Sequence, residues 1–363
     1  MEIVFFIGGL IALIAGAEFI VKGSAKIALY LGISPLVIGL TIVAMGTSAP
    51  ELAVSIQSGL EGKEGIALGN VIGSNIMNIL LILGLSALIH PLKVDQRLVQ
   101  IEVPIMIASS FIVYFMSLND VISRNEGIVL FSGIILYIIY TLVKSRKEKK
   151  KIIAEYEEEF GKKSELTKTS VLISSVLVVI GFILLVKGSE YLVEGAVNIA
   201  RYFEVSEFII SILIIALGTS LPEAATSVVA GLRGENDIAV GNAVGSNIFN
   251  LLSVMGAAAI FTPGGIDVDP GALSVDIPVM IAVAIACLPV FMADHTITRF
   301  RGGLFFGYFI FYVAYLIISA KEHQYLTAFN WIMLLFVIPL TLITFVYLMY
   351  KGILTHKNQK HKK

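Results

Sequence analysis

Two short phrases with nearly the same wording place an acidic side chain deep inside an apolar stretch of the chain. They are MGTSAPE at 45–51 and LGTSLPE at 217–223. A bare carboxylate at the centre of a bilayer costs at least about 2–3 kcal/mol, and ionisable residues in membrane segments commonly mark functional sites. A divalent cation between Glu51 and Glu223 would offset this cost and their mutual repulsion.

The oxygen atoms around these acids favour a hard cation. Proline removes a backbone donor and displaces the preceding residue from helical geometry, so we expect both helices to open, over 46–50 and 218–222, and to free carbonyl groups. The same phrases supply the hydroxyls of Thr47, Ser48, Thr219 and Ser220. Calcium takes about six to eight oxygen ligands in flexible geometry, whereas magnesium requires a small octahedron. No Cys or His lies at hand for a softer metal such as zinc.

A second duplicated phrase offers further ligands: GNVIGSNIMN at 69–78 and GNAVGSNIFN at 241–250. Ser74 and Asn78 are four residues apart, as are Ser246 and Asn250, so each pair lies on one face of a helix. We interpret these four side chains as the remaining oxygen ligands. Hydrogen bonding between helices is the alternative for each of them, and the glycines at the same spacing favour close helix packing.

The elements that must position these residues are membrane-spanning helices. Of the 363 residues, 57% are hydrophobic and 15% charged, whereas soluble domains are about 25% charged. The single cysteine, Cys287, excludes an internal disulfide. Apolar stretches long enough to cross a bilayer predict an all-α polytopic protein. The predicted spans are 3–22, 36–57, 66–89, 101–117, 126–143, 169–188, 207–230, 238–261, 274–292, 303–319 and 330–350.

The two phrases belong to a duplication. Residues 46–78 align with 218–250 at a constant offset of 172, and 19 of these 33 positions are identical. Five spans form each copy, and because five is odd the second copy is inserted upside down. Inverted repeats with interrupted helices are typical of secondary transporters whose site lies at the bilayer midplane. The predicted organisation is a first repeat at 1–143, a cytoplasmic loop at 144–168, a second repeat at 169–320, and an eleventh span with a basic tail at 321–363.

Positive charge predicts the orientation. With the N-terminus outside, the inside segments hold 21 of the 26 Lys and Arg residues, including the central loop and the C-terminal tail. This asymmetry follows the positive-inside rule and predicts that both of these segments are cytoplasmic. Glu18 and Glu190 occupy matching positions towards the ends of their spans, where we expect them to be solvated at the membrane interface.

The duplicated wording GTSxPE and GNxxGSNIxN, in inverted halves, resembles the alpha repeats of the cation/calcium antiporter superfamily, the sodium/calcium exchangers, and especially their small prokaryotic members. The resemblance covers about residues 1–320. It implies exchange of Ca2+ for Na+ across the cell membrane by alternating access, with the first helix of each repeat sliding against a fixed core. The ligands it implies are Glu51, Glu223, Ser48, Ser220, Ser74, Ser246, Asn78 and Asn250, with the carbonyls of Thr47, Thr219, Ala44 and Ala216.

The resemblance also implies what the chain does not need. We expect no enzymatic activity, no cofactor beyond the transported Ca2+ and Na+, and no nucleic acid or obligate protein partner. Some family members carry an aspartate where Asn250 stands, including the potassium-dependent branch, so this residue argues against potassium co-transport. The central loop is too short for a calcium-sensing domain, and the eleventh span is an addition to the ten-span pattern.

Other functions fit the residues less well. Calcium/proton antiport is the main alternative, because two desolvated, mutually repelling glutamates would readily accept protons. The neutral oxygens favour sodium, and the proton-exchanging branch has a differently worded repeat. A cation channel would use acidic residues but would rarely need inverted halves with broken helices. An intramembrane hydrolase with Ser48 or Ser220 as nucleophile would need a general base, and no His or Lys lies at that depth.

Overall fold

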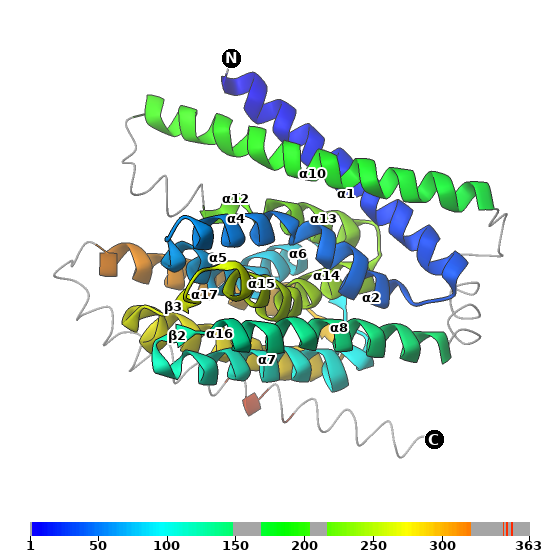
Figure 1. Ribbon diagram of the computed structural model, residues 1–363. Coiled ribbons are helices and arrows are strands. Elements are labelled where there is room, and N and C mark those ends of the chain that lie inside the picture. The colour runs from blue at the N-terminus through cyan, green and yellow to red at the C-terminus, as the bar shows by residue number, and fades with distance from the viewer. Residues whose placement is uncertain are drawn as a thin grey trace.

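The computed structural model describes residues 2–147, 168–203 and 216–320, together with residues 344, 346, 347 and 350. These residues are almost entirely helical (Figure 1). Within them, eight helices are long and apolar enough to cross a membrane, and the bent pair Pro35–Thr47 and Ala49–Leu60 makes a ninth if it is counted as one span. The prediction of an all-α polytopic membrane protein is confirmed. The expected span at 207–230 is described only from residue 216. The expected span at 330–350 lies outside the described residues, apart from four single positions.

Short irregular or π-helical stretches interrupt the helices of the first repeat. Its elements are α1 Glu2–Leu31, α2 Pro35–Ile38, a π-helical stretch Gly39–Val43, α3 Ala44–Thr47, α4 Ala49–Leu60, α5 Glu64–Met77, a π-helical stretch Asn78–Leu83, α6 Gly84–Ile89, β1 Leu92–Lys93, a π-helical stretch Leu98–Glu102, α7 Val103–Met116, a 3-10 turn Ser117–Asn119, β2 Val121–Ile122 and α8 Arg124–Lys147.

The second repeat reproduces this order. Its elements are α10 Lys168–Tyr202, α12 Ala216–Gly218, α13 Leu221–Leu232, α14 Asn236–Phe249, a π-helical stretch Asn250–Val254, α15 Met255–Phe261, β3 Ile266–Asp267, a π-helical stretch Ala272–Asp276, α16 Ile277–Met292, β4 Thr296–Ile297 and α17 Arg299–Ala320. The π-helical stretches at Asn78 and Asn250 are therefore symmetry mates, and so are those that end at Glu102 and Asp276.

The first helix of each repeat is longer than the apolar runs predict. Helices α1 and α10 contain 30 and 35 residues, which corresponds to about 45 and 52 Å. Both exceed the roughly 30 Å of a bilayer core and must tilt to fit it. The predicted spans 3–22 and 169–188 end too early because apolar composition marks only the part of a helix that crosses the bilayer core. In the structure Lys22 pairs with Glu18 at 2.6 Å and Lys187 pairs with Glu190 at 2.6 Å, so the helices continue through paired charges.

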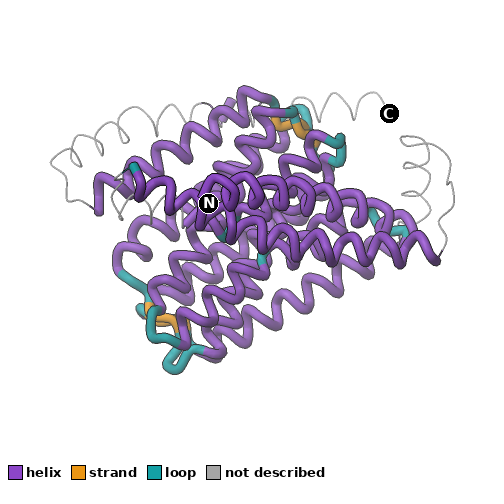
Figure 2. Tube along the Cα trace, turned by 90° about the horizontal axis from the view of Figure 1, so that it is seen from above, coloured by secondary structure: helices purple, strands orange, loops and turns teal. Residues whose placement is uncertain are grey.

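Helices α1 and α10 lie side by side across one face of the molecule (Figure 1), and Figure 2 views this face from above. Glycines bring the two antiparallel backbones together. A Cβ atom at Gly16 would lie 2.7 Å from the Gly181 carbonyl oxygen, and one at Gly9 would lie 2.7 Å from that of Gly188. Side chains at these positions would force the helices apart, so the glycines permit the close contact.

The other helices form the body beneath this pair, with α5 and α14 at its centre. The crossings Glu64–Ile89 and Asn236–Phe261 are 72% and 83% buried, the highest values among the described crossings. Two short strand pairs connect the repeats at opposite ends of the molecule (Figure 2). Strand β1 pairs with β4, and β2 pairs with β3, both antiparallel. Each pairing joins a loop of one repeat to a loop of the other, which holds the two halves of the body together.

Candidate ion-binding site

The expected helix breaks are present in both repeats. Helix α3 ends at Thr47 and α4 begins at Ala49, with a bend of 43° between them. In the second repeat α12 ends at Gly218 and α13 begins at Leu221. Each proline lies within the first turn of the helix that follows the break and has no N–H to donate backwards. The prediction that both helices are interrupted at the GTSxPE phrases is confirmed.

Both glutamates lie in the first turn of a half-helix. Glu51 belongs to the first turn of α4 and Glu223 to the first turn of α13, and both side chains are fully buried. The N-terminal end of a helix carries partial positive charge, which favours a carboxylate at this position. The broken-helix geometry thus partly compensates for the burial of two acids.

Hydroxyl groups cross between the repeats to reach these carboxylates. Ser48 Oγ donates to Glu223 Oε1 at 3.1 Å, and Ser220 Oγ donates to Glu51 Oε1 at 3.2 Å. Each serine of one phrase therefore contacts the acid of the other. This reciprocal pair of hydrogen bonds places the two breaks against one another at a single centre, as the inverted repeat predicts.

The second duplicated phrase lies on the same centre. Ser74 Oγ is 3.2 Å from Ser220 Oγ, while Ser246 Oγ is 3.4 Å from Thr47 Oγ1 and 3.5 Å from Glu223 Oε1. Ser74 and Ser246 come from α5 and α14, the two most buried helices. The structure thus brings together the serines of both phrases, as expected for oxygen ligands of one site.

Asn78 and Asn250 begin the two matching π-helical stretches, and both are buried. Asn78 Nδ2 donates to Asn247 Oδ1 at 3.0 Å, so this amide takes part in a hydrogen bond between repeats. Neither polar atom of the Asn250 amide has a hydrogen-bond partner among the described residues. Single π-helical turns occur frequently at functional sites because they displace side chains from regular helix positions.

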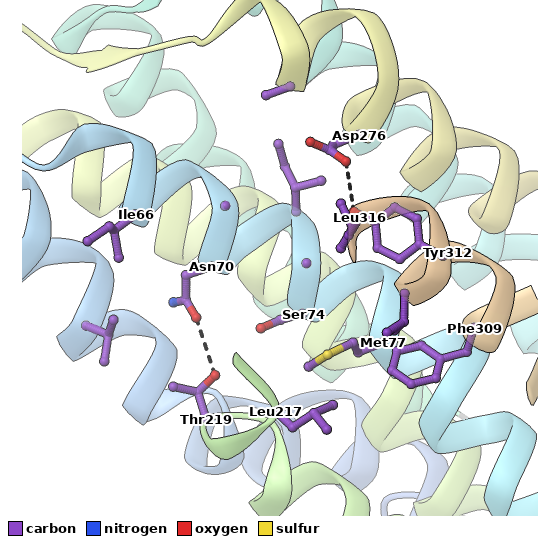
Figure 3. Close-up of a pocket in the computed structure, with 16 residues that line it drawn as sticks. Ile66, Asn70, Ser74, Met77, Leu217, Thr219, Asp276, Phe309, Tyr312 and Leu316 are labelled. Carbon is purple, nitrogen blue, oxygen red and sulfur yellow. Dashed lines mark hydrogen bonds between the residues drawn. The ribbon is translucent and has the colours of Figure 1, made fainter. Parts of the chain in front are cut away.

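Two further asparagines, which are not among the predicted ligands, hold the site together. Asn70 Nδ2 donates to the Glu51 carbonyl at 3.1 Å, and Asn242 Nδ2 donates to the Glu223 carbonyl at 3.3 Å. Their amide oxygens accept from Thr219 Oγ1 at 3.3 Å and from Thr47 Oγ1 at 3.1 Å (Figure 3 draws the Asn70–Thr219 bond). Asn70 precedes Ser74 by four residues and so lies on the same helix face. This spacing, repeated in both copies, was a signal that could have revealed them.

The backbone carbonyl groups at the two breaks differ in the hydrogen-bond donors that they accept from. Because Pro222 has no N–H, the Gly218 carbonyl loses its helical donor, and Ser189 Oγ of α10 donates to it at 2.5 Å. Ala44, whose carbonyl the resemblance implies as a ligand, accepts from the Ser48 N–H at 3.0 Å and from Thr47 Oγ1 at 3.3 Å. Ala216 begins α12 at the edge of the described residues.

Several buried oxygens of this centre have no hydrogen-bond partner among the described residues. They are Glu51 Oε2, Glu223 Oε2, Asn78 Oδ1 and Asn250 Oδ1. An unsatisfied buried carboxylate or amide oxygen is costly and calls for an explanation such as a bound ion. Within the described residues no three His, Cys, Asp or Glu side chains form a metal-binding group. The centre instead combines two carboxylates with neutral oxygens, which suits hard cations such as Ca2+ and Na+.

Comparisons with known proteins agree with this geometry. The family model described as "Sodium/calcium exchanger protein" matches residues 1–145 and 173–318. The inner membrane protein YrbG of Escherichia coli is 36% identical over 278 residues, which cover 76% of this chain and 84% of that protein. The sodium/calcium exchanger MaX1 of Methanosarcina acetivorans is 30% identical over 340 residues, covering 85% of this chain and 96% of MaX1.

Solved structures and a more distant relative complete the comparison. A structure of the sodium-calcium exchanger NCX_Mj superimposes with a TM-score of 0.74 at 31% identity, covering 87% of this chain and 98% of that chain. The Ca(2+)/H(+) antiporter ChaA of Bacillus subtilis is 28% identical over 255 residues, 66% of this chain and 70% of ChaA.

Proposed function

Because the chain belongs to the sodium/calcium exchanger protein family and is therefore a multi-pass cation/calcium antiporter rather than an enzyme, we propose that it exchanges Ca2+ for Na+ by alternating access at the Glu51–Glu223 centre. One observation carries this proposal: each buried acid accepts a hydrogen bond from a serine of the opposite repeat, and its second carboxylate oxygen has no partner among the described residues.

Charge balance supports competition between the two ions. Two carboxylates carry a charge of −2, which one Ca2+ or two Na+ ions neutralise. Burial of an unneutralised charge is costly, so the centre favours states in which one kind of cation has replaced the other. We assign the ligands expected from the resemblance to this centre: Glu51, Glu223, Thr47, Thr219, Ser48, Ser220, Ser74, Ser246, Asn78 and Asn250, with the carbonyls of Ala44 and Ala216.

Proton coupling is the competing proposal. The relationship to ChaA and the presence of two buried carboxyl groups favour it. The many neutral oxygens around the acids favour sodium, because protons need no such ligands. Thr47, Ser48 and Ser74 and their symmetry mates all contribute side-chain oxygen to the centre.

We further propose that the N-terminus lies outside the cell membrane and that the 144–168 loop and the C-terminus lie in the cytoplasm. The distribution of Lys and Arg supports this orientation. It places the β2–β3 strand pair outside and the β1–β4 pair inside.

The decisive experiment measures which gradient drives calcium uptake. Purified protein is reconstituted into liposomes, and 45Ca2+ uptake is followed with an outward Na+ gradient, an outward H+ gradient, or no gradient. We expect the Na+ gradient alone to drive accumulation of Ca2+. Uptake driven by the pH gradient and indifferent to Na+ would establish the proton alternative, and equilibration without any counter-ion gradient would indicate a channel.

A further inference from the structure

A cavity of about 530 Å³ adjoins the proposed ion site and contains a second, separate acid. Asn70, Ser74 and Thr219 lie at its inner side, and Asp276 and Tyr312 line it at a distance from them (Figure 3). Ser74 is hydrogen-bonded to Ser220, which in turn donates to Glu51. The cavity therefore extends from Asp276 to Ser74, which is separated from the Glu51 carboxylate only by the hydroxyl of Ser220.

Asp276 has a symmetry mate that also accepts a hydrogen bond from a tyrosine. Glu102 ends the π-helical stretch before α7, and Asp276 ends the matching stretch before α16. Each acid accepts a hydrogen bond from a tyrosine: Tyr137 Oη donates to Glu102 at 2.8 Å, and Tyr312 Oη donates to Asp276 at 2.9 Å. The inverted repeat has therefore built two equivalent acid–tyrosine pairs, one in each half.

The two pairs differ in what neutralises the acid. Glu102 is fully buried and is bound by Arg97 Nε at 2.9 Å. Arg97 precedes Glu102 by five residues, and the position five residues before Asp276 is Gly271. Within the described part of the chain Asp276 forms no ion pair, and its carboxylate is half-buried at the cavity wall. The protein thus supplies a cation to one acid and leaves the other facing a cavity.

We propose that Asp276, held by Tyr312, is a second cation-binding position, which transiently holds a partly hydrated Ca2+ or Na+ ion on its way between solvent and the Glu51–Glu223 site. In the other repeat, the side chain of Arg97 neutralises the matching acid, Glu102, in place of such an ion. Tyr312 occupies Oδ1 and leaves Oδ2 of Asp276 for the ion. A carboxylate at the wall of a low-dielectric cavity raises the local concentration of cations and the rate of their entry. This inference rests on the proposed exchange of cations, and in the orientation proposed above the cavity belongs to the outer half.

Transport measured separately from each membrane side tests the proposal. Asp276→Asn keeps the shape and a hydrogen-bond acceptor for Tyr312 but removes the charge. We expect the Ca2+ concentration for half-maximal uptake to rise about threefold to tenfold from the cavity side and to stay unchanged from the other side. The difference should shrink as choline chloride is raised from about 0.1 M to about 1 M, where the Debye length falls from about 10 to 3 Å. Asp267→Asn, an exposed acid on β3, is the matched control.

An equal shift from both sides, or the same shift in Asp267→Asn, would overturn the proposal. A binding measurement keeps it testable even if Na+ is not the counter-ion. Tb3+ is added to detergent-purified protein that carries Glu51→Gln and Glu223→Gln, and its emission is excited through nearby tyrosine. We expect a residual Tb3+ signal that disappears on further substitution by Asp276→Asn or Tyr312→Phe. A signal that is already absent before these substitutions, or one that persists in both variants, would overturn the proposal.

Discussion

At the scale of single residues, charge and neutral oxygen have separate roles in the centre. Among the described residues, the carboxylates of Glu51 and Glu223 supply the formal charge of the centre, whereas the surrounding Ser, Thr and Asn side chains supply neutral oxygens and fix geometry. A substitution that removes charge should therefore act differently from one that adds it.

Removal of one acid should abolish transport and leave the fold intact. Glu51→Gln or Glu223→Gln removes a charge that Ca2+ needs. It also removes a buried charge that the ion-free protein must otherwise accommodate, so the free energy of unfolding should stay level or rise. Calcium flux in liposomes and thermal unfolding in Ca2+-free buffer measure the two effects. Flux at the level of the unmodified protein in either variant would refute the central site.

Addition of an acid should strengthen the binding of monovalent cations. With two carboxylates, one Ca2+ or two Na+ ions give a neutral site, and a third monovalent ion leaves it positive. Asn250 is buried and both its amide atoms are unpaired among the described residues. Asn250→Asp should therefore favour an additional monovalent ion and introduce sensitivity to K+. The measurement is Ca2+ flux against K+ concentration at fixed Na+. Identical curves for both proteins would place Asn250 outside the ion site. A K+ requirement in the unmodified protein would contradict the inference that the uncharged Asn250 excludes K+ co-transport.

Much of this centre could be predicted from the sequence, for a physical reason. Pro50 and Pro222 break helices by local sterics, and the buried acids follow them directly, so no tertiary information is needed. The contact of Asn247 with Asn78, the hydroxyl of Ser189 on the Gly218 carbonyl, and the role of Asp276 depend on which helices are neighbours. Periodicity reports the face of a helix but not what lies against it. Apolar composition also does not show that α1 and α10 continue past Lys22 and Lys187, whose charges pair with Glu18 and Glu190.

At the scale of elements, one ion pair connects the long helix α1 to the end of a broken helix. Arg233, which follows α13, binds Glu18 of α1, and Glu18 also pairs with Lys22. Glu18 was expected to be solvated at the membrane interface, but its side chain is only 19% exposed. The symmetry mates of Glu18 and Arg233 are Glu190 and Glu61, which pair with lysines close to them in sequence instead. The ion pair between α1 and the end of α13 therefore has no counterpart between α10 and the end of α4.

This asymmetric ion pair should stabilise the arrangement in which the Asp276 cavity is open. Arg233→Gln removes the pair, and an exposed ion pair contributes about 0.2–1 kcal/mol. We expect the open population to fall by up to about fivefold. The readout is the rate at which an impermeant maleimide modifies a cysteine introduced by Val54→Cys, which lines the cavity. The native Cys287 is buried and should contribute little background. Lys63→Gln, which breaks only the Glu61–Lys63 pair, is the control; an equal change in both variants would argue against a connection through α1.

At the scale of the whole molecule, the second predicted repeat ends at residue 320, and the family model matches the chain up to residue 318. Every contact described for the ion centre involves residues between 41 and 250, and the strand pairs that join the repeats end at Ile297. Deletion of residues 321–363 should therefore leave exchange largely intact. Calcium uptake by the truncated protein in liposomes, normalised to inserted protein, checks this expectation. A stably inserted truncation without transport would make the C-terminal segment part of the mechanism.

The glycine contacts between α1 and α10 have a consequence for the efficiency of energy conversion. An antiporter dissipates its driving gradient when both sides of its ion site can be open at once, because one ion then crosses the membrane without exchange for the other. Helices α1 and α10 cannot separate without losing the backbone contacts at Gly9, Gly16, Gly181 and Gly188 together. In the proposed alternating-access cycle these contacts would make the two helices move as one unit, so that an opening towards one side would be a closure towards the other. The tight coupling of the two ion fluxes would then depend on the contact between α1 and α10, which binds no ion.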